Sequence, residues 1–181
     1  IDLVILTHLH FDHAGGLTSH APDGKLVSAF PSAEIVVQEQ EWNDAMSNKS
    51  TMSATYLRTH LDPIADQVRR INGETTIIDG IQAIPTPGHT WGHQSILIDE
   101  INGPLCFTGD LLPTVNHVGR SWSMGYDMLP HDTLLTKERI LRQAADEGWR
   151  LALDHEPGNA LVTVDHDSKK NWFKLILEEA G

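Results

Sequence analysis

Three histidines and an aspartate stand within six residues, directly behind an apolar run. His8, His10, Asp12 and His13 follow Asp2–Leu6, which we predict to be a buried strand because it is short and rich in strand-forming residues. Neutral imidazole is the commonest metal ligand in proteins, and carboxylate is its usual oxygen partner. A strand that runs into a loop brings such side chains to one point at the end of a sheet. We therefore interpret this segment as part of a metal site rather than as a His-rich polar loop.

Three later predicted strands also end in side chains that can bind a metal. These side chains are His89 after Ile81–Ile84, Asp110 after Leu105–Thr108, and His155 after Arg150–Leu153. Active sites of layered α/β folds collect at strand ends, where loops converge. Four strands that each end in this way are stronger evidence than any single motif. Helical segments alternate with the strands, so we predict an α/β architecture.

The remaining pattern predicts further strands and helices. The strands are Ala33–Gln38, Thr75–Ile78 and Gln94–Asp99, and the helices are Gln38–Met46, Leu61–Ile71 and Thr133–Glu147. Two alternatives stay open for the tail. A hairpin of Ala160–Val164 with Trp172–Leu177 is favoured, because residues 161–164 are strongly β-forming. The other is a terminal helix over Lys169–Ala180.

Composition fits one globular domain over residues 1–181. The net charge of −12 comes from 13 basic and 25 acidic residues and disfavours a nucleic-acid partner. No apolar stretch approaches the ~20 residues of a membrane span, and the single cysteine, Cys106, excludes an intrachain disulfide. We expect a small-molecule substrate and no nucleic-acid or membrane partner. The sequence leaves the location open, with a cytoplasmic one favoured. The sequence leaves a homo-oligomer open.

The chain resembles the metallo-β-lactamase superfamily from residue 1 to about residue 165. Thr-His-Leu-His-Phe-Asp-His, Thr-Pro-Gly-His-Thr, Gly109-Asp110 and a late His155 occur in the order typical of that superfamily. The resemblance implies an αββα sandwich with a metal centre at one edge of its two sheets. It also implies a ligand set: His8, His10 and His89 for a first metal, Asp12, His13 and His155 for a second, and Asp110 as a bridge.

Seven such ligands are too many for one tetrahedral zinc ion but suit a pair of divalent ions. Two ions roughly 3.5–4 Å apart can share a hydroxide that attacks a polarised carbonyl. Asp12 and Asp110 are therefore the candidate catalytic carboxylates, Asp12 as the group that orients the nucleophile or returns a proton. Zinc is the default ion, while the mixed nitrogen and oxygen set also suits Mn²⁺, Fe²⁺ or Co²⁺.

Departures within the superfamily narrow the expected reaction. Common zinc β-lactamases carry Cys where Asp110 stands, and di-iron oxygen-reducing relatives carry Glu where His10 stands. Residues 110–127 are similar to the branch of quorum-quenching lactonases and related esterases, which implies lactone or ester hydrolysis. His93, His117 and Tyr126 are candidate substrate-pocket residues. The alternatives are a thioesterase of the glyoxalase II kind, a mononuclear iron oxidoreductase like the sulfur dioxygenases, and a catalytically silent binding domain.

In this superfamily, strands precede the His-rich loop and complete one sheet. The present sequence begins at Ile1, already inside a predicted strand. We therefore expect the N-terminal strands of the fold to be absent from this sequence. We also expect the natural protein to carry a preceding segment that contributes to the substrate pocket.

Overall fold

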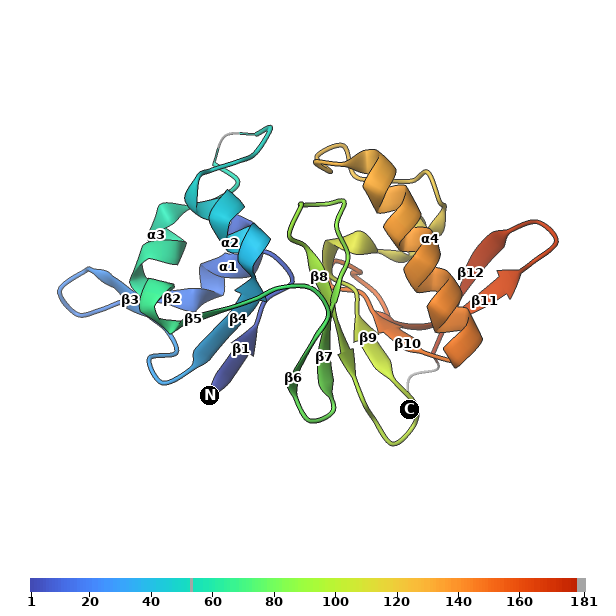
Figure 1. Cartoon of the computed structure of the whole chain (residues 1–181), viewed down its shortest axis with the longest axis horizontal. Helices are drawn as coiled ribbons and strands as arrows, with labels where there is room; N and C mark the ends of the chain where they lie inside the picture. The colour runs from blue at the N-terminus through green and yellow to red at the C-terminus, as the bar shows by residue number, and fades with distance from the viewer. Residues whose placement is uncertain (53, 179–181) are drawn as a thin grey trace.

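Two sheets of unequal size face one another in a computed structural model that describes residues 1–52 and 54–178 (Figure 1). The smaller sheet contains three parallel strands in the order β1 (Leu3–Ile5), β4 (Glu34–Gln38) and β5 (Val68–Ile71). Helices α1 (Phe11–Ala14), α2 (Glu39–Met46) and α3 (Arg58–Leu61) lie with it on the left of Figure 1. Short 3₁₀ helices η1 (Gly15–Leu17) and η2 (Asp62–Gln67) and a hairpin of β2 (Thr18–His20) and β3 (Leu26–Ser28) complete this half.

The larger sheet has seven strands in the order β12-β11-β10-β9-β8-β7-β6. Their bounds are β6 Thr75–Ile78, β7 Ile81–Pro85, β8 Gln94–Ile98, β9 Leu105–Phe107, β10 Arg150–Ala152, β11 Leu161–Asp167 and β12 Trp172–Leu177. The long helix α4 (Pro130–Glu147) packs on it, and η3 (Gly109–Leu111) and η4 (Val115–Val118) follow β9. Within the described residues, no helix is both long enough and apolar enough to cross a membrane.

The apolar residues form three clusters, one for each interface between layers. Ile35 and Val37 of β4 pack against the helices of the smaller half. Val36, between them, points to the opposite side and packs against residues of both sheets, including Ala83 and Ile96. Successive side chains of a strand alternate between faces, so an uninterrupted apolar run marks a strand covered on both sides. With the third cluster beneath α4, these contacts form the αββα sandwich that the resemblance implies.

Most elements agree with the sequence prediction. The tail is confirmed as a hairpin of β11 and β12, and the long helix is confirmed, beginning three residues earlier than expected, at Pro130. The helix predicted over Leu61–Ile71 is wrong in its second half. Residues 68–71 are strand β5, which pairs in parallel with β4. A parallel strand depends on a partner distant in sequence, and Ile71 is buried between the sheets only because β4 supplies that partner.

Strand direction brings the predicted ligands to one edge. β9 and β10 are parallel, and β7 runs the same way because it and β9 are both antiparallel to β8. The carboxyl ends of these three strands therefore meet. The smaller sheet is joined to this edge by Gln94, whose side-chain amide donates to the carbonyl of Leu6 at 2.7 Å and whose backbone N–H donates to that of Thr7 at 3.0 Å.

Candidate metal centre

Three buried imidazoles form a first group at this edge. His8 and His10 follow β1, His89 follows β7, and each offers one ring nitrogen within 4.8 Å of the others. His89 Nε2 lies 2.9 Å from His10 Nδ1, and the ring centres of His8 and His89 are 4.7 Å apart. The structure thus brings together the three side chains that the resemblance assigns to a first metal.

A second group contains two imidazoles and two carboxylates. His13 of α1, Asp110 of η3, and Asp154 and His155 behind β10 each offer one atom within 4.8 Å of the others. Asp110 Oδ1 lies 3.3 Å from His13 Nε2 and 3.1 Å from His155 Nε2. This group is more open than the first, since the His155 side chain is 42% exposed.

Asp110 stands between the two groups. While its Oδ1 faces His13 and His155, its Oδ2 lies 3.1 Å from Nε2 of His89 and 3.9 Å from Nε2 of His8. One oxygen of the same carboxylate therefore faces each group. A bridging carboxylate needs this arrangement.

Asp12 and Asp154 lie on different sides of the second group. Asp12 lies at the exposed edge of the second group, with Oδ2 3.6 Å from His13 Nε2 and 3.7 Å from His155 Nε2, and its role as a ligand stays a prediction. Asp154 is the carboxylate that the ligand prediction left out. Its Oδ2 lies 4.0 Å from Nδ1 of His13, on the other side of that ring. Its position next to His155 in the sequence is the signal that could have included it.

Burial and neighbouring charges shift the pKa values of the two groups in different directions. Burial lowers the pKa of His8 and brings that of His10 to about 3, so both rings favour the neutral, metal-binding form. Burial alone would also lower the pKa of His13, but its contact with Asp110 raises that pKa. Burial would raise the pKa of Asp110, yet the contact with His13 and the charges of the adjacent imidazoles hold that pKa below its usual range. Burial, then the charge of Asp110, raise the pKa of Asp154 to about 7.

The donor set fits a pair of divalent ions. Within the described residues, Nε2 of His8 and Oδ1 of Asp110 are buried without a hydrogen-bond partner, one in each group. Buried polar atoms are otherwise nearly always paired, so unpaired atoms within such groups of potential ligands are typical of metal sites. Imidazole nitrogens with carboxylate oxygens are also the donors that zinc, manganese, iron and cobalt accept.

Close packing holds these loops in place. Asp127 Oδ1 accepts a hydrogen bond from Nδ1 of His89 at 2.9 Å, which leaves Nε2 of that ring directed at the site. Gly109 has a φ of +54°, and a Cβ there would lie 2.7 Å from Cγ2 of Thr7. The turn that presents Asp110 therefore requires glycine.

A cavity of about 260 Å³ opens beside Asp110. It is lined by His10, Phe11, Asp12, Met52, Thr55, Asp110, Tyr126 and Met128. Of the three predicted substrate-pocket residues, Tyr126 is the one that lines this cavity among the described residues. His93 is buried, with its ring centre 5.1 Å from that of His8, and its Nδ1 is hydrogen-bonded to the hydroxyl of Thr86. His117 lies on η4, where its Nδ1 is 2.8 Å from Oγ1 of Thr114.

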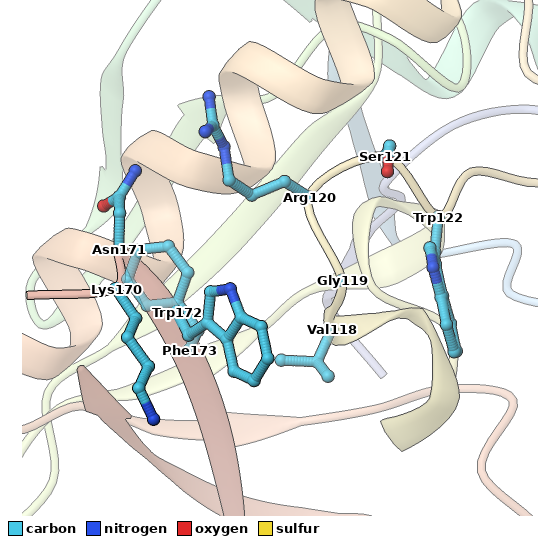
Figure 2. A pocket seen from close by; sticks show the side chains of 9 residues that line it. All are labelled: Val118, Gly119, Arg120, Ser121, Trp122, Lys170, Asn171, Trp172 and Phe173. Atoms are coloured by element: carbon cyan, nitrogen blue, oxygen red, sulfur yellow. The ribbon is translucent and has the colours of Figure 1, made fainter. Parts of the chain in front are cut away.

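A second cavity, of about 540 Å³, lies between residues 118–122 and the β11–β12 hairpin. Figure 2 shows Trp122 and Trp172 among the side chains that line it. The buried Lys137 fixes its wall by donating to the carbonyls of His117, Gly119 and Trp122. Its lining comes from other residues than those of the two groups. The smaller cavity, which touches His10 and Asp110, is therefore the candidate substrate pocket.

Comparison with known proteins agrees with this geometry. A model of the metallo-beta-lactamase superfamily matches residues 1–155. An N-acyl homoserine lactonase of a Bacillus species is 37% identical over 108 residues, which cover 59% of this chain and 37% of the relative.

Two solved structures are similar over most or all of the chain. A probable metal-dependent hydrolase from Staphylococcus aureus superposes with a TM-score of 0.84 at 28% identity, covering 100% of this chain and 64% of that protein. An N-acyl homoserine lactone hydrolase with N-hexanoyl-L-homoserine at its catalytic metal centre gives a TM-score of 0.66 at 26% identity, covering 86% and 56%. The chain therefore spans less than two thirds of the length of these relatives.

Proposed function

The chain belongs to the metallo-beta-lactamase superfamily, and from this premise we propose that it is a dinuclear metal-dependent hydrolase of lactones or esters. The position of Asp110 carries the proposal, because one carboxylate oxygen faces each group of potential ligands. His8, His10 and His89 would hold one ion. His13 and His155 would hold the other, with Asp12 or Asp154 as a further oxygen ligand.

The chain's own side chains can position a substrate and move a proton. Ions held here supply Lewis-acid chemistry, in that they polarise a carbonyl and lower the pKa of water. Tyr126 lines the cavity and can donate a hydrogen bond to the carbonyl oxygen, where negative charge develops. Water adds to the carbonyl carbon and gives one proton to the carboxylate of Asp12, the C–O bond to the alcohol breaks, and Asp12 returns this proton to the departing oxygen.

The volume and lining of the cavity support a small acylated lactone as the substrate. Its volume of about 260 Å³ lies just below the roughly 300–1,000 Å³ of pockets that bind drug-sized ligands. Phe11, Met52 and Met128 give it an apolar wall for an acyl chain, with the carboxylates of Asp12 and Asp110 at its polar side. The Bacillus relative is an N-acyl homoserine lactonase, which favours this substrate class.

The test combines metal analysis with a substrate panel. We expect about two equivalents of metal per chain by elemental analysis and hydrolysis of N-acyl homoserine lactones or aryl esters that a chelator abolishes. For the variant Asp110→Asn we expect reduced metal content and reduced activity. Faster hydrolysis of thioesters would favour the glyoxalase II-like alternative, and one iron with oxygen consumption would favour the oxidoreductase. Folded protein that takes up no metal would contradict the proposal.

A further inference from the structure

A fully buried glutamate lies behind the first group of imidazoles. Glu41 of α2 is 0% exposed. Its Oε1 accepts hydrogen bonds from the backbone N–H of Leu9 at 2.9 Å and from the hydroxyl of Tyr56 at 3.1 Å. Its Oε2 accepts one from the hydroxyl of Thr90 at 2.6 Å. Both oxygens of the carboxylate are therefore used, and all three partners come from outside its own helix.

Each of these partners adjoins one of the predicted ligands of the first group. Leu9 lies between His8 and His10, and Thr90 directly follows His89. The ring of Tyr56 packs against that of His10, with the ring centres 5.1 Å apart. One carboxylate thus connects the loop behind β1 with the turn behind β7, although these segments are about 80 residues apart in the chain.

Helix α2 and the turn that carries His89 also touch directly. A Cβ on Gly92 would collide with the backbone of Glu41. The helix therefore sits at a fixed distance from this turn, and the hydrogen bond to Thr90 fixes the turn against it. A carboxylate is costly to bury unless hydrogen bonds compensate for its lost hydration. An apolar side chain would fill the same space but would leave the N–H of Leu9 unpaired.

We propose that Glu41 is a positioning residue that sets the separation of His8, His10 and His89 and thereby the affinity of this group for a divalent ion. The inference rests on the function proposed above. Glu41 acts through Leu9, Tyr56 and Thr90, so it shapes the ion site without touching the ion.

Three variants test this role by zinc affinity, measured in competition with a chromophoric chelator, and by the absorption spectrum of bound Co²⁺. Glu41→Leu removes the acceptors, and we expect the first equivalent of zinc to bind about 10- to 100-fold more weakly. Glu41→Gln should restore most of the affinity, because its oxygen can accept from Leu9 and Tyr56 while its amide donates to the oxygen of Thr90. Ala45→Gly, a buried site on the same helix, should lower thermal stability and leave zinc affinity unchanged.

The outcomes separate positioning from folding. Wild-type affinity in Glu41→Leu would overturn the inference, and so would an equal loss of affinity in Ala45→Gly. If Glu41→Leu does not fold, Thr90→Val breaks one contact only. A several-fold weaker first zinc with an altered Co²⁺ spectrum would then support the inference, and unchanged binding would overturn it. Wild-type protein that binds no zinc would contradict the proposed function itself.

Discussion

Removal of the carboxylate behind His89 should weaken the first metal site by a predictable amount. Asp127 Oδ1 accepts from Nδ1 of His89 at 2.9 Å, and Oδ2 accepts from the backbone N–H of Met124 at 3.3 Å. Both side chains are almost completely shielded from water. A hydrogen bond to a charged group contributes about 1.5–3 kcal/mol, and about 1.4 kcal/mol corresponds to a factor of ten. We therefore expect Asp127→Ala to weaken zinc binding by about 10- to 100-fold, the range typical of groups that orient a ligand.

Asp127→Asn gives a graded test, because an amide has one oxygen for two N–H donors. Its effect should lie between those of the wild type and of Asp127→Ala in the same chelator competition. Asp132→Asn is the matched control, since that exposed carboxylate lies 3.7 Å from Nδ1 of the exposed His131. We expect the control to leave zinc affinity unchanged. Folded Asp127→Ala with wild-type affinity would refute the reasoning.

Three further predictions follow from the same geometry. The pKa of His13 is raised, so below that pKa a second ion must displace a proton from His13, and the affinity of the second site should fall about tenfold per pH unit as the pH drops. The affinity of the first site should depend less on pH, because the pKa of His10 is about 3. Equal slopes for the two sites in zinc titrations from about pH 5.5 to about pH 8 would contradict this prediction. Tyr126→Phe should lower kcat by about 100- to 1,000-fold with metal content unchanged, and a fall in zinc occupancy instead would assign Tyr126 to the metal site. Leu141→Ala, on the buried face of α4, should lower the free energy of unfolding in urea by about 2–5 kcal/mol, whereas a loss below about 1 kcal/mol would contradict the packing described.

The grouping of the candidate ligands could be predicted from the sequence, because each lies shortly after an apolar run. An apolar run followed by a His or Asp marks a strand end, and strands that run the same way carry such ends to one edge of a sheet. The structure places His89 and Asp110 together in this way, since β7 and β9 run in the same direction. Strand β5 was missed because Leu61, Ile64, Ala65 and Val68 have helical spacing, and the competing signal lies in the distant β4. Local periodicity does not contain that signal.

The residues that support the ligands could not be predicted in the same way. Glu41 reaches Thr90, 49 positions away, and Asp127 reaches His89 across 38 positions. Asp127 follows no strand, and Glu41 follows β4 but lies within a predicted helix, so the strand-end rule selects neither. Each is recognised only in the fold, where its buried carboxylate forms a hydrogen bond with a predicted ligand or with a residue next to one. A glutamate one helical turn before the apolar Ala45 was the available signal for Glu41, but it also fits a solvated position near a helix end.

Burial decreases in one direction across the site, and this gradient decides from where a substrate can approach. His8 and His89 are fully enclosed and have protein on their far sides, with Glu41 and Asp127 as their supports. Beyond Asp110, the side chains of His155 and Asp12 are 42% and 41% exposed. The cavity opens on this exposed side, since Asp12 and Asp110 both line it. A carbonyl group entering there would reach Asp110 with Asp12 on its solvent side, where Asp12 can pass a proton to the departing oxygen.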